Sequence, residues 1–265
     1  MSDTTTHDVM VAQTEKAGVL LDYFQGHRDA LEADRVAHGQ AVAAQLGNLK
    51  NLIRTEMYFS GTVDPNEATP TNVDGGTFSS INTLLNTAPP GAFVDIILLS
   101  DATYVIDSNL FTYATSLSFR QTGAGAKPIL QLVGFASGAF NSLYTLRPLG
   151  VSHVQLTNVV IQFPTAKPDP ALPWASDRTL VRYALAGPTS CGMVGCLVTG
   201  TLDHGVVSAN AGATNLQMYN CTLDGVYGVA SGQGGISLIG ATGVTLQNSA
   251  ALIEGGTLGE TYLLA

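Results

Sequence analysis

The stretch Leu216-Gln-Met-Tyr-Asn-Cys-Thr-Leu-Asp224 decides the fold, because the chain repeats its pattern. Its first and third positions are apolar, which is the alternation of a β-strand. Its fifth position is Asn or Gly in every copy, and these two residues best tolerate a left-handed backbone. Each copy therefore predicts two short strands joined by a sharp bend. Three segments align with it without gaps and a fourth aligns more loosely: Val154–Gln162, Cys191–Thr199, Val244–Leu252 and, loosely, Leu130–Gly138.

The spacing of the bends predicts how these units stack. Successive intervals are 24, 37, 25 and 28 residues, measured between Gly134, Asn158, Gly195, Asn220 and Asn248. A period of roughly 25 residues is typical of one coil of a parallel β-helix, in which each coil buries its apolar face against its neighbours. We expect about five or six coils. Equivalent positions then form interior ladders, one of which contains Leu132, Leu156, Met193, Met218 and Leu246.

Composition supports a large core and excludes several classes of protein. Of the 265 residues, 45% are hydrophobic and only 12% are charged, with a net charge of −9. That charge argues against nucleic-acid binding, which requires clustered Lys and Arg. No apolar run is long enough for a membrane span, and the N-terminus MSDTTTHDVM lacks a secretory signal, so synthesis in a cytoplasm is expected. Three cysteines do not make a disulfide framework, and we expect Cys196 and Cys221 to be buried, unreactive ladder neighbours.

The first 58 residues differ from the rest. They are charged, rich in Ala and free of proline, since the first of eleven prolines is Pro65. They predict a helix with an apolar seam, which Arg28, Arg35 and His38 interrupt and in which a four-residue step after Val42 is typical of a stutter. We expect residues 1–58 to be a coiled-coil stalk for attachment and trimerisation. An amphipathic helix packed on its own chain is the alternative. The oligomerisation seam contains Leu21, Phe24, Leu31, Val42, Leu46, Leu49 and Ile53.

The remaining chain divides further. Residues 59–76 are rich in turn formers and predict a neck, and residues 77–265 predict the β-helix. Residues 77–88 place apolar side chains on one helical face and predict a helix that caps the first coil. Residues 164–175 contain four prolines and the only tryptophan, which predicts an inserted loop. There Trp174, Asp177 and Arg178 are the best candidates for contacting a surface ligand, although Trp174 equally fits a role in packing the loop onto the coil.

The passage DGGTFSSINTLLNTAPPGAFVDIILLSDATYVI resembles the leading segment of right-handed parallel β-helix proteins such as pectate lyases and phage tailspikes. Together with the stalk, the chain resembles a trimeric tail fibre or tailspike of a tailed bacteriophage, or of a phage-derived gene transfer agent. The resemblance implies a mainly β, right-handed parallel β-helix in a homotrimer on a virion. It also implies that the N-terminus binds tail, baseplate or particle proteins, and that the coils bind a host-surface glycan or protein.

An enzymatic role needs carboxylates grouped on one outer face. Asp203 and Asp224 are 21 residues apart, so they are candidates for one face, with His204 beside them. Ordinary turn chemistry explains the same residues, and the clustered Asp set of pectate lyases is missing. We therefore expect a structural protein without a cofactor or metal. A polysaccharide lyase or depolymerase is one alternative, and a capsid-attached fibre or adaptor without receptor contact is another.

Overall fold

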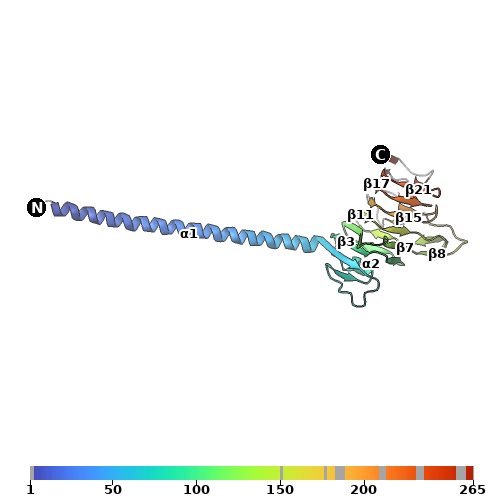
Figure 1. Ribbon diagram of the computed structural model, residues 1–265, viewed down its shortest axis with the longest axis horizontal. Coiled ribbons are helices and arrows are strands. Elements are labelled where there is room, and N and C mark those ends of the chain that lie inside the picture. Colours follow the sequence, from blue (N-terminus) through green and yellow to red (C-terminus); the bar gives the residue numbers. More distant parts are fainter. Residues whose placement is uncertain are drawn as a thin grey trace. The chain divides into compact units, whose positions relative to one another are not determined.

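The structure is a computed structural model that describes residues 3–149, 152–175, 178–182, 189–208, 213–230, 236–254 and 261–264. The chain divides into two units, Met1–Arg54 and Thr55–Ala265. The described part of the first unit lies within helix α1 (Asp3–Met57), and the predicted long N-terminal helix is confirmed (Figure 1). No described helix has the length and apolar character needed to span a lipid bilayer.

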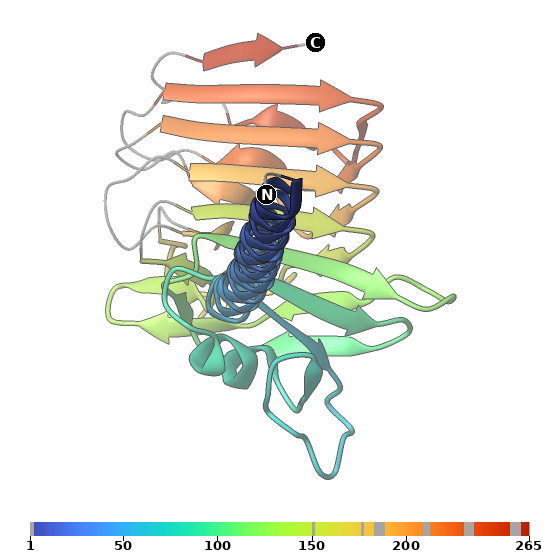
Figure 2. The same ribbon diagram turned by 90° about the vertical axis from the view of Figure 1, so that its left-hand side faces the viewer.

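The second unit is a parallel β-helix, as predicted (Figure 2). Sheet A has the strand order β2 (Gly76–Phe78), β1 (Tyr58–Val63), β3 (Phe93–Leu99), β6 (Ser116–Thr122), β11 (Ser152–Thr157), β14 (Thr189–Val194), β17 (Ala213–Tyr219), β20 (Ile236–Thr242) and β23 (Thr261–Leu264). Sheet B has β4 (Thr103–Ile106), β7 (Ile129–Leu132), β12 (Val160–Gln162), β15 (Leu197–Thr199), β18 (Thr222–Asp224) and β21 (Thr245–Gln247). Sheet C has β5 (Leu110–Thr112), β10 (Leu146–Pro148), β13 (Thr179–Val181), β16 (Gly205–Ser208), β19 (Tyr227–Ala230) and β22 (Ala251–Ile253).

The start of the β-helix is closed by the short helix α2 (Ile81–Thr87), within the predicted range 77–88. The Ser80 hydroxyl caps it by accepting from the Thr83 amide at 3.1 Å. Ile81, Leu84 and Leu85 are buried and cover the interior of the first coil. The segment expected to be a neck begins with β1, whose Phe59 and Val63 are buried, so its first residues belong to the sheet.

The interior ladder of sheet A differs from the prediction at both ends. Its members, paired in register from β3 to β20, are Ile96, Phe119, Leu156, Met193, Met218 and Ala241. Leu132 and Leu246 were assigned wrongly, because they lie in strands β7 and β21 of sheet B. Apolar alternation followed by Gly or Asn occurs at the ends of sheet B strands as well, so the pattern alone does not distinguish the two sheets. Cys196 and Cys221 are neighbours in adjacent coils and are buried free thiols.

The structure also differs from the prediction at two of the five bends. Asn158, Gly195 and Asn220 have positive φ and follow sheet A strands, as the repeat predicted. Asn248 has a φ of 50° but follows β21 in sheet B, and the bend equivalent to Asn220 is Gly243. Gly134 is not a left-handed bend and instead begins β8 (Gly134–Ser137).

Two consecutive coils are long, and each carries an insertion. His153 pairs with Ser116, 37 positions earlier, and Ser190 pairs with His153, again 37 positions earlier. The first long coil contains an antiparallel hairpin of β8 and β9 (Phe140–Leu143), which the sequence pattern did not predict. The second contains the predicted proline-rich segment. Residues 134–143 and 163–175 together are called the insertion wall below.

Candidate functional site

The predicted catalytic residues do not occupy equivalent positions. Asp224 lies opposite Thr199 of the preceding coil. Gly205 pairs with Tyr227 of the next coil. Asp203, two residues before Gly205, is therefore level with Gly225 and not with Asp224. The Asp224 carboxylate, at the last position of β18, accepts a hydrogen bond of 2.5 Å from the Asn248 side chain of the next coil. Among the described residues no group of three or more His, Cys, Asp and Glu side chains is arranged to hold a metal ion.

His204 is a core residue with no exposed surface. Its ring stacks on Phe163 at a centroid distance of 5.1 Å and meets Trp174 edge-on at 4.7 Å. Its Nδ1 lies 3.1 Å from the Thr201 hydroxyl, while its Nε2 is buried with no hydrogen-bond partner among the described residues. Burial lowers the pKa of His204 to about 4, because the charged form loses its hydration. The imidazole is therefore neutral near pH 7 and faces the interior.

The predicted ligand-contact residues are also largely covered. Trp174 is 8% exposed, which agrees with the packing role rather than with surface contact. Arg178 donates a hydrogen bond of 2.6 Å to the Glu254 carboxylate, and the two side chains are only 15% and 18% exposed. Asp177 lies outside the described residues. The structure therefore brings Trp174 together with His204, and Arg178 together with Glu254.

Asn141 joins the two parts of the insertion wall and is fully buried. Its side-chain amide donates to the carbonyls of Asp169 and Leu172 at 2.8 and 2.9 Å. Its side-chain oxygen accepts from the Asp169 amide at 3.0 Å. Its own backbone bonds to Pro173 and Ala175 at 2.8 Å each. Five hydrogen bonds thus fix the proline-rich segment to strand β9 of the hairpin.

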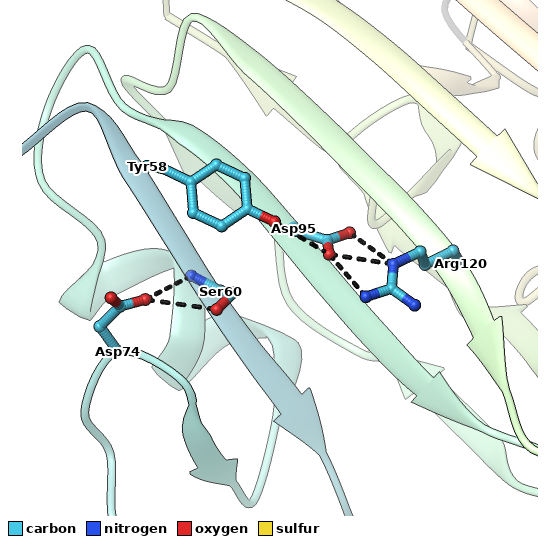
Figure 3. Close-up of polar contacts among 5 residues, drawn as sticks. All are labelled: Tyr58, Ser60, Asp74, Asp95 and Arg120. Atoms are coloured by element: carbon cyan, nitrogen blue, oxygen red, sulfur yellow. Dashed lines mark hydrogen bonds and ion pairs between the residues drawn. The ribbon is translucent and has the colours of Figure 1, made fainter. Parts of the chain in front are cut away.

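Sequence reasoning missed a polar cluster on the outer face of sheet A (Figure 3). Asp95 on β3 is 7% exposed and receives hydrogen bonds from Arg120 Nε on β6 at 2.9 and 3.1 Å. The Tyr58 hydroxyl on β1 donates to the same carboxylate at 3.3 Å. Beside it, the Asp74 carboxylate accepts from the backbone amide and hydroxyl of Ser60 at 2.7 and 3.3 Å.

This cluster ties three successive strands together. The Asp95 partner raises the pKa of Arg120, and burial followed by the Asp95 charge raises the pKa of Tyr58. The short hydrogen bonds between Arg120 and Asp95 join neighbouring coils, which suits a structural role better than acid–base chemistry. The signal in the sequence was a single acidic residue, Asp95, inside the apolar strand Phe93–Leu99. Its partner Arg120 lies two residues after Ser118, the residue that pairs with Asp95 in the next coil. Two positions along a strand keep a side chain on the same face.

The clearest hollow near the insertions has a volume of about 460 Å³. Gln131 and Gln162, paired in register on β7 and β12, contribute to it from sheet B. Thr165, Lys167 and Pro168 contribute from the insertion wall. We call this hollow the insertion groove.

Searches of protein-family models, curated proteins and solved structures found no match to this chain. The parallel β-helix is shown by the register of its own strands. The surfaces that bear on function are the apolar residues of α1 and the insertion groove.

Proposed function

We propose that the chain is a homotrimeric virion fibre or spike protein of a tailed bacteriophage or a related particle. Its N-terminal helix attaches to tail, baseplate or other particle proteins, and its β-helix is presented to the host surface. One observation carries the proposal, namely the uncovered apolar seam of α1. In the single chain Leu21, Phe24, Leu31, Val42, Leu46 and Leu49 are 40–65% exposed. The side chain of Ile53 lies outside the described residues.

The seam argues for partner helices because of its size. Full burial of one large apolar side chain contributes about 1.5–3 kcal/mol, so six such side chains represent on the order of 10 kcal/mol per chain. A long helix that leaves such a row in water is marginal alone and is stabilised by packing against others. Seam residues on a further copy of the same helix are complementary, since coiled coils pair equivalent positions.

The polar middle of the seam supports self-association in one register. Arg35 forms two hydrogen bonds to Glu32, with Nε to Oε2 at 2.9 Å and a terminal nitrogen to Oε1 at 2.5 Å. Arg28 and His38 interrupt the same face. Polar residues at core positions of a coiled coil lower its stability but fix alignment, because a shifted register would place them against apolar neighbours. We assign them this aligning role, and we take the three-fold order from the resemblance to tail fibres.

The coils supply a stiff scaffold for contact, and the proposal gives them no catalytic role. The proposal uses no catalytic group: His204 is buried, and Asp203 and Asp224 are offset by one position in the register of their coils. The proposed ligand is a glycan or protein of the host surface. No nucleic acid and no membrane insertion enter the proposal.

The test is the mass of the intact protein in solution, measured by light scattering after size exclusion. We expect three times the chain mass of 27.5 kDa. Removal of residues 1–58 should reduce it to the mass of one shortened chain. A monomer of 27.5 kDa at micromolar concentration would refute the fibre proposal. Imaging of intact particles with labelled protein then distinguishes a tail position from a capsid position.

A further inference from the structure

We propose that the insertion groove binds a carboxylate-bearing sugar of the host surface. This inference rests on the host-binding role proposed above and names its ligand class and its residues. Gln131 and Gln162 line it from sheet B, Thr165 and Pro168 line it from the proline-rich segment, and Lys167 supplies the charge.

The proline-rich segment that contributes the side of the groove is fixed to the hairpin immediately after its lining residues. Asn141 fixes the proline-rich segment through its five hydrogen bonds. Pro168 and Trp174 close over Gly134, where an added Cβ would lie only 2.9 Å from the proline Cγ and 3.1 Å from the indole ring. Glycine at 134 thus permits the proline-rich segment to approach the start of β8. Rigid walls reduce the entropy that binding must overcome.

Sheet B presents two amides side by side. Gln131 and Gln162 pair in register across neighbouring coils, whose strands lie about 4.8 Å apart. A carboxamide both donates and accepts hydrogen bonds, so the pair matches the alternating donors and acceptors of sugar hydroxyls. Within the part of the chain that the structure describes, no hydrogen bond joins either side-chain amide to another residue, so both can bond to a ligand.

The charge of the lining favours an anion. Lys167 lines the groove, and no Asp or Glu is among its lining residues. The nearby Asp169 carboxylate accepts from the Ala171 amide at 2.9 Å and is not part of the lining. One exposed ammonium without a competing carboxylate suits one carboxylate on the ligand, since charge-assisted hydrogen bonds are the stronger kind.

The groove also has a suitable size. Its volume of about 460 Å³ falls within the range of about 300–1,000 Å³ that is usual for small-molecule sites. A sugar ring in the groove would contact the side chains that line it. These are Gln131 and Gln162 from sheet B and Thr165 and Pro168 from the proline-rich segment.

The experiment measures binding to the full-length protein by titration calorimetry and saturation-transfer NMR. The probes are trigalacturonate with its neutral methyl ester, and 3′-sialyllactose with neutral lactose. We expect at least one acidic probe to bind, its neutral counterpart to bind at least tenfold more weakly, and added salt to weaken the complex. Lys167→Gln should weaken binding at least tenfold, and Gln162→Ala should also weaken it.

Lys16→Gln on α1 is the matched control and should leave binding unchanged. Thermal melting of each variant verifies that it folds. Absence of binding by both acidic probes, equal binding of the neutral forms, or unchanged binding by Lys167→Gln would overturn the inference. The mass of the same samples separates the two proposals. A trimer that binds no acidic probe overturns the groove alone, and a monomer that binds one overturns the fibre alone.

Discussion

Asn220 and Gly243 occupy the same bend in successive coils, and the side chain of the first fills the place of the missing side chain of the second. The backbone amide of Asn220 donates to the Thr242 carbonyl at 2.9 Å. Asn220 and Gly243 both have a left-handed backbone, with φ of 51° and 65°. A Cβ built on Gly243 would overlap the Oδ1 of Asn220. Asn158 and Gly195 repeat this arrangement earlier in the β-helix. Asparagine and glycine therefore alternate along the stack of bends.

We predict that Gly243→Ala destabilises the β-helix by about 1–3 kcal/mol, because it adds both left-handed strain and a steric overlap. Urea unfolding followed by circular dichroism measures the change. The control is Gly26→Ala on α1, where an added Cβ meets nothing within 4 Å. There alanine should stabilise the helix by about 1 kcal/mol. Equal effects at both sites would contradict the interpretation of the bend.

The seam of α1 gives a second prediction, for which the chain provides a matched pair of valines. Val42 lies in the proposed seam and is 40% exposed, whereas Val36 lies outside it and is 46% exposed. Val42→Asp should dissociate the oligomer, because a carboxylate among packed helices loses its hydration. Val36→Asp should leave the mass unchanged. Sedimentation velocity measures the oligomeric mass of both variants. Dissociation of both would show that the seam is not the specific contact that holds the oligomer together.

Burial of His204 predicts loss of stability in acid. Its folded pKa is about 4 and its usual value is 6.5, so the unfolded chain takes up a proton first as the pH falls. The stabilisation is fully present above pH 6.5 and is lost progressively down to pH 4. The whole difference is about 3 kcal/mol. Urea unfolding at pH 7.5 and pH 4.5 should show a smaller pH dependence for His204→Phe, and an identical dependence in both proteins would count against this role.

Asn141→Asp should release the insertion wall while leaving the coils intact. The carboxylate cannot donate to the carbonyls of Asp169 and Leu172, and it places charge beside them. Each buried carbonyl left unsatisfied costs about 1–3 kcal/mol. Hydrogen exchange should accelerate at the Asn141 and Ala175 amides and stay slow in β14. Uniform acceleration throughout the β-helix would show instead that Asn141 supports the whole fold.

Local patterns allowed much of the fold to be predicted from the sequence. The helix followed from a proline-free, charged segment, and the coils followed from strand alternation with Asn or Gly at bends such as Asn158 and Asn220. The place of Leu246 could not be predicted in this way, because the same alternation serves sheets A and B. The β8–β9 hairpin was missed because Gly134 resembles a bend, although it begins a strand outside the coil.

The candidate sites were less accessible to sequence reasoning, because they depend on register. Trp174 was identified as notable, but its burial against His204 depends on the way the loop folds back. Gln131 and Gln162 become neighbours only when the coils on either side of the hairpin are aligned. The ion pair of Asp95 and Arg120 required the same information. Residue type and spacing thus indicated the scaffold, whereas tertiary pairing determined which side chains meet.

The two long coils are consecutive, and this order has a consequence for how the molecule can change. The hairpin of one coil is held by the loop of the next through Asn141, so the two insertions depend on each other. The strands on either side of them, β6, β11 and β14, nevertheless remain in register. A change in the contacts of one insertion at Asn141 therefore requires a matching change in the other, whereas the strands between them, β10, β11 and β12, can keep their sequence.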